Sequence, residues 1–266
     1  MSSLPLETFL KRDRAVVISA LATLVLLAWA YLFWLANRMN IAGSISEMPG
    51  MIIAQPSLRP WNVPEFAFTF AMWAVMMVGM MLPSAAPMIL LYSRIVTHAH
   101  ERGWAFAKSG WFLCGYLLSW TLFSLAATAA QGILEHVALL TPMMVAATHP
   151  IAGIILIGAG LYQWTPLKHA CLTQCRSPLE FIQSRGGFGA GGSGALRAGF
   201  IHGLYCVGCC WALMTLLFAG GVMNIVWIAI LAVLVFLEKV FPGGYVIARI
   251  AGVGLVAIGL GLVLHG

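Results

Sequence analysis

The sequence has 266 residues, of which 61% are hydrophobic and only 8% are charged. Soluble domains carry about a quarter charged residues, so this composition excludes an ordinary soluble globule and favours a protein embedded in a lipid bilayer. The formal net charge of +6 does not indicate nucleic-acid binding. The basic residues fall in short loops between apolar stretches, where they report membrane orientation instead.

The apolar stretches predict an all-α, polytopic transmembrane bundle of about seven helices, because one span needs roughly 20 apolar residues to cross about 30 Å of hydrocarbon. Pro83 and Pro87 should bend the second span, since each removes a backbone donor. Residues 1–266 form a single transmembrane domain in this interpretation. The expected spans are 15–36, 65–92, 104–130, 151–167, 198–219, 222–238 and 243–264.

The distribution of basic residues predicts the orientation of the bundle. If the N-terminus lies in the cytoplasm, only Arg38 and Arg59 of the 14 lysines and arginines fall on the outer side. The positive-inside rule therefore predicts a cytoplasmic N-terminus and an outer C-terminus. The sequence gives no indication of the oligomeric state.

The fifth expected span concentrates soft metal donors in an uncharged stretch. Cys206, Cys209 and Cys210 are accompanied by His202 and Met214, and residues three or four positions apart share a helix face. Cys206 should lie about 12 Å into the span at 1.5 Å per residue. Thiolate, imidazole and thioether groups select monovalent copper or zinc over calcium or magnesium, so we expect a metal site near the middle of the membrane.

Packing is the alternative explanation of the same stretch. A buried cysteine behaves as a small apolar residue, and Gly199 and Gly203 form a GxxxG pattern that favours close contact between helices. The grouping of three cysteines within five residues, Cys206 to Cys210, favours the metal site over packing.

The second expected span supplies thioethers that would complement these thiols. Met77 and Met81 lie four residues apart on one face, and neutral thioethers hold a soft cation without the desolvation cost of carboxylates. Methionine also fills gaps beside bent helices, so core packing stays open for this stretch. Cys114 is expected at a depth similar to that of Cys206, with packing favoured over metal binding.

A second group of thiols follows the fourth span. Cys171 and Cys175 are four residues apart and would share a helix face, while Lys168 and Arg176 lie near enough to favour the thiolate form. The pair is a candidate cytoplasmic docking site for a soft metal or a reactive dithiol, with a surface pair lacking any role as the alternative. We expect this pair and the Cys206 group to form two separate stations.

Charged residues near the end of the sixth span are expected to pair with each other. Glu238 is the only carboxylate close to the interior of a span. We predict that it pairs with Lys239 or Arg249 at the inner interface, where long basic side chains reach water.

Three motifs carry a resemblance to a known family. The segments MWAVMMVGMMLPSAAPM, YQWTPLKHACLTQCRSP and GLYCVGCCWALM resemble a bacterial family of predicted metal-binding integral membrane proteins, a domain of unknown function. The resemblance implies metal handling in a bacterial inner, or cytoplasmic, membrane. It carries over to Cys171, Cys175, Cys206, Cys209 and Cys210, with Met80, Met81 and Pro83 as the matching part of the second span.

These observations support one leading function and two alternatives. The leading hypothesis is a membrane protein that binds a soft transition metal, copper as Cu(I) with zinc as the other candidate, and transports it or delivers it to a metallochaperone or metalloprotein client. The candidate ligands are Cys206, Cys209, Cys210, His202, Met77, Met81, Cys171 and Cys175. The alternatives are a thiol-disulfide oxidoreductase that uses the CxxC pair Cys206 and Cys209, and an accessory subunit of a membrane complex. Metal binding is favoured over an enzymatic role.

Overall fold

The computed structural model describes residues 4–46, 61–98, 105–141, 144–177, 181 and 191–266. Within these residues every named element is a helix, which confirms the all-α prediction. The helices are α1 (Leu4–Ser46), α2 (Val63–His98), α3 (Ala105–His136), α4 (His149–Tyr162), α5 (Pro166–Arg176), α7 (Gly191–Gly220), α8 (Ile225–Val240) and α9 (Gly244–His265).

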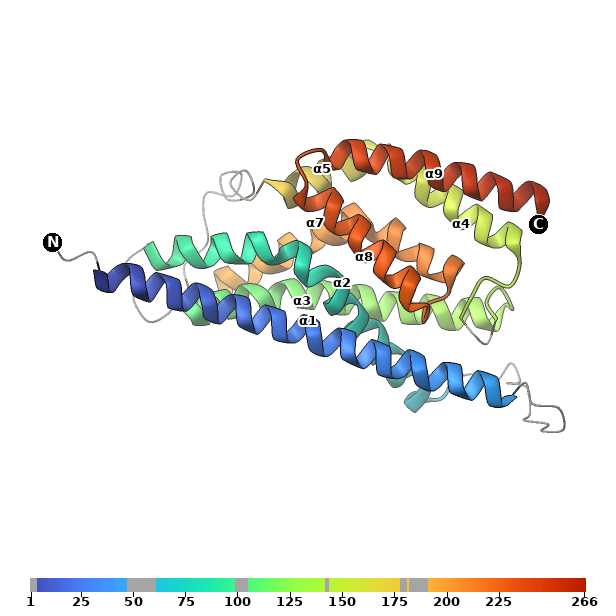
Figure 1. Ribbon diagram of the computed structural model, residues 1–266, viewed down its shortest axis with the longest axis horizontal. Helices are drawn as coiled ribbons and strands as arrows, with labels where there is room; N and C mark the ends of the chain where they lie inside the picture. Colours follow the sequence, from blue (N-terminus) through green and yellow to red (C-terminus); the bar gives the residue numbers. More distant parts are fainter. Residues whose placement is uncertain (1–3, 47–60, 99–104, 142–143, 178–180, 182–190) are drawn as a thin grey trace.

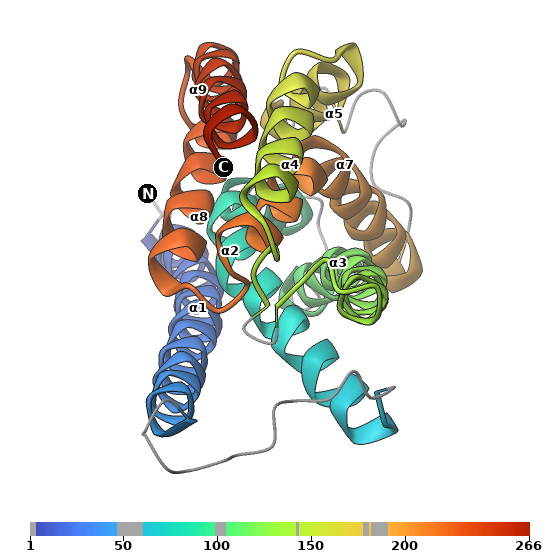
Figure 2. The ribbon, with the colours of Figure 1, turned by 90° about the vertical axis from the view of Figure 1, so that its right-hand side faces the viewer.

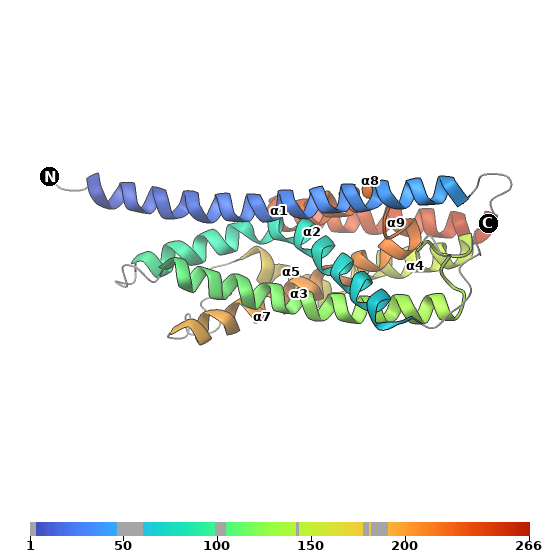
Figure 3. The ribbon, with the colours of Figure 1, turned by 90° about the horizontal axis from the view of Figure 1, so that it is seen from below.

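The long helices lie roughly parallel to the long axis of the molecule (Figure 1). Seen along that axis, α2 lies near the centre, with α1 and α9 on one side and α3 and α7 on the other (Figure 2). The two halves of α2, the helix that contains Pro83 and Pro87, run in different directions (Figure 3). This change of direction agrees with the bend that proline imposes on a helix.

Among the described residues, five helices are long and apolar enough to cross a membrane, namely α2, α3, α7, α9 and the Ala15–Met39 part of α1. The pair α4 and α5 would make a sixth span if its two bent segments cross together. Helix α8 has 16 residues and reaches about 24 Å at 1.5 Å per residue, less than the hydrocarbon thickness. The structure is therefore compatible with a multi-pass membrane protein.

The number of crossings and their direction stay predictions. Helix α1 begins at one end of the long axis and α9 ends at the other (Figure 1), as an odd number of crossings requires. Arg59, which we counted on the outer side, lies outside the described residues.

Glycines bring α3 and α7 into backbone contact. A Cβ atom at Gly199 would collide with the carbonyl oxygen of Phe112, and one at Gly203 would lie 2.6 Å from Ser119 Oγ. A Cβ atom at Gly115 on α3 would in turn collide with the backbone of α7. The packing role expected of the GxxxG pattern is confirmed, and this seam fixes the position of the cysteines that follow on α7.

The segment between α4 and α5 interrupts the stretch that we expected as a single fourth span. Helix α4 ends at Tyr162, and α5 leaves it at an angle of 65°. Thr165 has extended backbone angles, as expected of a residue before proline, and its hydroxyl accepts a hydrogen bond from the Lys168 amide. The Thr165–Pro166 step thus starts a new helix, with threonine as the cap and proline in the first turn.

Candidate metal centre

The three cysteines of α7 are buried together in the core. Cys206, Cys209 and Cys210 are at most 2% exposed, as their place in an apolar span predicted. The thiols of Cys209 and Cys210 both donate to the Cys206 carbonyl oxygen, at 3.1 and 2.9 Å. Both thiols therefore donate to a backbone carbonyl oxygen in the preceding turn of their own helix.

Helix α5 brings a fourth thiol to the same place. Cys175 Sγ lies 3.9 Å from Cys209 Sγ, and Cys171 lies against α7, where a Cβ atom added at Gly208 would be 2.8 Å from its sulfur. The prediction of two separate stations is therefore wrong. The bend before Pro166 turns α5 onto α7, and the spacing of residues along the chain does not reveal such a turn.

Of the two predicted methionine ligands on α2, Met81 approaches a cysteine thiol and Met77 does not. Met81 Sδ lies 4.0 Å from Cys210 Sγ. Met77 is fully buried, but no hydrogen bond joins it to a cysteine in the part of the chain that the structure describes. We use the name sulfur cluster for Cys175, Cys206, Cys209, Cys210 and Met81.

His202 and Cys114 lie in different surroundings from the cluster. His202 is one turn before Cys206 on the buried face of α7, and its ring is surrounded by the rings of Phe112, Tyr116 and Phe181 at centroid distances of 5.3–6.0 Å. Its Nδ1 atom is buried, with no hydrogen-bond partner among the described residues. Cys114 is exposed on α3 and takes no part in the cluster.

Lys239 enters the cluster from α8, which the sequence did not lead us to expect. Its ammonium donates to Cys206 Sγ at 2.8 Å and lies 3.9 Å from Cys210 Sγ. It also lies 4.0 Å from Met81 Sδ and 3.5 Å from Ser84 Oγ. A charged nitrogen is thus held among three sulfur atoms in the interior of the bundle.

Tyr116 of α3 completes the surroundings of Cys206. Its hydroxyl lies 3.0 Å from Cys206 Sγ and donates to the Met81 carbonyl oxygen at 3.3 Å. Cys206 Sγ therefore has two polar partners from other helices, the Tyr116 hydroxyl and the Lys239 ammonium. These contacts distinguish it from a cysteine that only fills space.

Glu238 pairs with a partner that we did not predict. Its Oε2 atom accepts from the Lys168 ammonium at 2.6 Å, and its Oε1 atom accepts from Gln163 Nε2 at 3.1 Å. The predicted pairing with Lys239 or Arg249 is wrong. Lys239 cannot share the site of Glu238 because successive residues of a helix point about 100° apart. Glu238 consequently faces the break between α4 and α5, while Lys239 faces the sulfurs.

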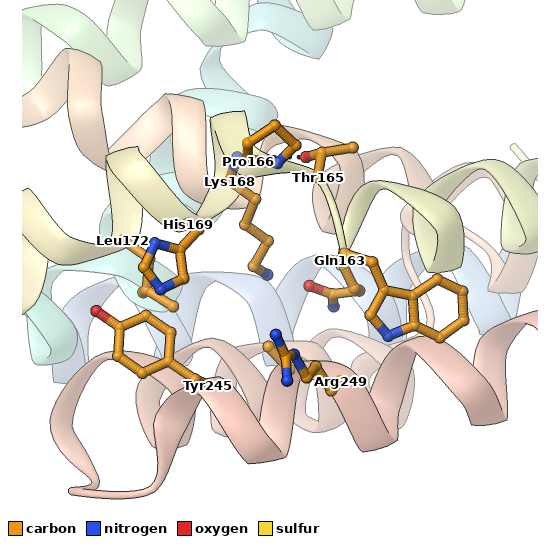
Figure 4. Close-up of a pocket in the computed structure, with 10 residues that line it drawn as sticks. Gln163, Thr165, Pro166, Lys168, His169, Leu172, Tyr245 and Arg249 are labelled. Atoms are coloured by element: carbon orange, nitrogen blue, oxygen red, sulfur yellow. Dashed lines mark hydrogen bonds between the residues drawn. The ribbon is translucent and has the colours of Figure 1, made fainter.

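A cavity of about 210 Å³ lies beside this ion pair, between the α4–α5 break and α9. Figure 4 shows the side chains of Lys168, Gln163 and Arg249 converging on it, with His169 and Tyr245 at one end. Lys168, which lines the cavity, is 1% exposed.

The donors of the cluster suit a soft ion, but they are not arranged around one. Within the described residues, no group of three or more histidine, cysteine or acidic side chains is disposed to hold a metal ion directly. The physical reason is visible in Cys209 and Cys210, whose thiols face a carbonyl oxygen. Four thiols and one thioether nevertheless meet there, and such sulfur donors favour Cu(I) and zinc.

The fold and this cluster define a helical, membrane-compatible protein with a buried sulfur-rich centre. A family model described as a copper chaperone, PpoB2, matches residues 70–262, and the chain belongs to this family. The matched region contains every predicted ligand, and it supports the metal-binding character that the resemblance implied. Neither curated proteins nor solved structures gave a match to the chain.

Lys239 and Tyr116 are the residues of the centre that sequence reasoning missed. Lys239 had a usable signal, since an ionisable residue close to a transmembrane stretch marks a functional site more often than chance. We assigned it to the membrane interface because it ends the apolar run of the sixth span. Tyr116 carries no charge and offered no comparable signal.

Proposed function

We propose that this protein binds Cu(I) at the sulfur cluster and delivers it to a metalloprotein client from a bacterial inner membrane. The observation that carries the proposal is the convergence of sulfur atoms from α2, α5 and α7, with Cys175 Sγ 3.9 Å from Cys209 Sγ and Met81 Sδ 4.0 Å from Cys210 Sγ. The description of the family as a copper chaperone supports the choice of metal.

The chemistry of the cluster favours a soft ion such as Cu(I) over a hard ion. Thiolates and thioethers bind Cu(I) well, whereas hard ions require oxygen ligands. Among the described residues, no carboxylate forms a hydrogen bond with a cluster thiol. The cargo would be bound by Cys206, Cys209 and Cys175, with Cys210 and Met81 as further donors, once the thiols give up their carbonyl partner and their protons.

The place of α5 in the cluster supports transfer rather than permanent storage. Cys171 and Cys175 are only partly buried, whereas the three thiols of α7 are fully enclosed. Cys171, whose sulfur lies beside Gly208 of α7, is a partly exposed thiol next to the buried ones, and this arrangement permits stepwise exchange of a metal between sulfur ligands. In the predicted orientation this entry would face the cytoplasm.

The test is the copper content of the detergent-purified protein, loaded anaerobically with Cu(I) and measured by elemental analysis. We expect about one copper ion per chain for the wild type and clearly less for Cys206→Ser, because loss of a ligand should weaken the metal affinity at least tenfold. Cys114→Ser is the matched control and should retain copper. Equal copper in Cys206→Ser and the wild type would refute the proposal.

A thiol-disulfide reaction is the second candidate, and one distance favours it. Cys175 of α5 and Cys209 of the predicted CxxC pair bring their sulfur atoms to 3.9 Å from each other. Their oxidation would form one S–S bond and pass two electrons and two protons to an external disulfide. Exposure to oxidised glutathione followed by peptide mapping would show a Cys175–Cys209 crosslink if this chemistry operates, and two free thiols if it does not.

A further inference from the structure

The cavity between the α4–α5 break and α9 has no part in the proposed function, because no residue of the sulfur cluster lines it. Its volume of about 210 Å³ exceeds the roughly 30 Å³ that one water molecule takes in the liquid. Figure 4 shows Lys168, Gln163 and Arg249 turned toward this space. The groups that these three side chains present decide what kind of occupant fits.

The lining of the cavity carries one permanent positive charge without a counter-charge. The Lys168 ammonium is paired with Glu238 Oε2 at 2.6 Å, so these two groups cancel. Arg249 is exposed, and in the part of the chain that the structure describes no hydrogen bond or ion pair engages its guanidinium. A guanidinium binds phosphate or carboxylate groups through two parallel hydrogen bonds. The cavity therefore favours an occupant with one negative charge.

The lining also contains a buried acceptor without a donor. Gln163 donates through Nε2 to Glu238 Oε1 at 3.1 Å, and this bond fixes which end of the amide is the oxygen. The Gln163 Oε1 atom is buried and has no hydrogen-bond partner among the described residues. Because an unsatisfied buried acceptor is costly, it points to an occupant that carries a hydrogen-bond donor beside its anionic group.

The location of the cavity favours a lipid over a dissolved anion. Arg249 is the sixth residue of α9, about 7.5 Å from its start at 1.5 Å per residue. In the predicted orientation its long side chain therefore reaches the cytoplasmic headgroups. Trp164, a residue type common at membrane interfaces, lines the cavity beside it. Toward the centre of the bilayer follow Val253 and Leu161, which are exposed and offer a surface for acyl chains.

We propose that this cavity is a binding site for an anionic phospholipid with a hydroxylated headgroup. The Arg249 guanidinium holds the phosphate, a headgroup hydroxyl donates to Gln163 Oε1, and the acyl chains lie along the exposed apolar residues of α4 and α9. Basic pockets between membrane helices on the cytoplasmic side bind lipid headgroups in this way. The proposal does not depend on metal binding, since the sulfur cluster and the cavity share no residue.

The test uses lipids that differ in one feature of the headgroup. The purified, delipidated full chain in a non-ionic detergent is titrated with each lipid, and native mass spectrometry measures the lipid bound per chain. Phosphatidylglycerol has both the phosphate and the hydroxyls, phosphatidylmethanol has the same charge without a hydroxyl, and diacylglycerol lacks the phosphate. Glycerophosphoglycerol, the same headgroup without acyl chains, is added as a competitor to test for a dissolved anion.

We expect phosphatidylglycerol to bind most tightly and diacylglycerol least tightly. Phosphatidylmethanol should bind several-fold more weakly than phosphatidylglycerol, because the buried acceptor then stays unpaired. Arg249→Met should weaken phosphatidylglycerol binding at least about tenfold, since it removes hydrogen bonds between charged groups. Arg197→Met is the matched control and should retain binding, because Arg197 is an exposed arginine of α7 that does not line the cavity.

Each part of the proposal has a result that overturns it. Equal binding of phosphatidylglycerol and diacylglycerol, or equal losses in Arg249→Met and Arg197→Met, would show that the cavity does not recognise a phosphate. Displacement of the lipid by an equal concentration of glycerophosphoglycerol would indicate a site for a dissolved phosphate ester instead. Equal binding of phosphatidylglycerol and phosphatidylmethanol would refute the contact with Gln163. Should Arg249→Met not elute as a single species, the lipid series on the wild type decides.

Discussion

Two regions of the bundle are rich in buried sulfur, and they differ in what surrounds the sulfur atoms. The sulfur cluster is in contact with the Lys239 ammonium and the Tyr116 hydroxyl. The first half of α2 holds a second set, which we call the methionine stretch: Met72, Met76, Met77 and Met80, all at most 1% exposed.

The methionine stretch belongs to the apolar core. Its neighbour Trp73 packs against Phe218 at a centroid distance of 5.4 Å, and the four thioethers fill the space among such groups. Burial and sulfur content alone therefore do not identify a metal site. The distinguishing features of the cluster are the convergence of several helices and the presence of polar partners.

The largest expected effect concerns the buried ion pair between Lys168 and Glu238. Glu238→Gln should lower the free energy of unfolding by about 3–5 kcal/mol, because it leaves the Lys168 ammonium buried without its carboxylate partner. Chemical denaturation in detergent, followed by tryptophan fluorescence, measures the change. The double variant Lys168→Met with Glu238→Leu should recover most of the loss, since it removes both charges. A loss below 1 kcal/mol in Glu238→Gln would show that the pair is hydrated.

The next effect tests whether α5 belongs to the cluster. Cys175→Ser should weaken Cu(I) binding at least tenfold, because Cys175 Sγ is the thiol of α5 in contact with Cys209 Sγ. Chelator competition under anaerobic conditions measures the affinity. Cys114→Ser provides the control, since Cys114 is exposed on α3. An unchanged affinity in Cys175→Ser would indicate that the cysteines of α5 and those of α7 do not form one site.

The smallest effect compares one methionine from each region. Met81→Leu should weaken Cu(I) binding by several-fold, whereas Met77→Leu should leave it unchanged, because only Met81 Sδ reaches a cluster thiol. Both changes conserve volume and should cost less than about 1.5 kcal/mol of stability. The same titration measures both variants, and equal losses of affinity would contradict the distinction between the regions.

The sequence allowed us to predict properties within single helices, but not how the helices pack around the sulfur cluster. The cysteines of α7 could be predicted as buried because they lie in an uncharged stretch of the fifth span. The spacing of Gly199 and Gly203 predicts close contact with another helix, but it does not identify that helix as α3. These conclusions depend on properties within one helix, where a regular repeat fixes which residues share a face.

The other features of the site depend on contacts between helices, which the sequence does not reveal. Cys175 reaches Cys209 because the chain turns by 65° between α4 and α5. The Thr165–Pro166 step signals a helix break but not its angle. Lys239 was assigned to the interface because it ends an apolar run, and the sequence does not show which helices α8 faces at that point. Met77 and Met81 look equivalent in the sequence, and only the approach of α7 separates them.

The glycine seam between α3 and α7 has a consequence for genetics. A side chain larger than hydrogen at Gly115 or Gly199 would meet backbone atoms of the other helix, which do not move aside as a flexible side chain does. Variants at these positions should therefore lower the cellular amount of the protein through misfolding and degradation. In a screen for copper sensitivity they would resemble ligand variants, and only measurement of protein abundance would tell the two classes apart.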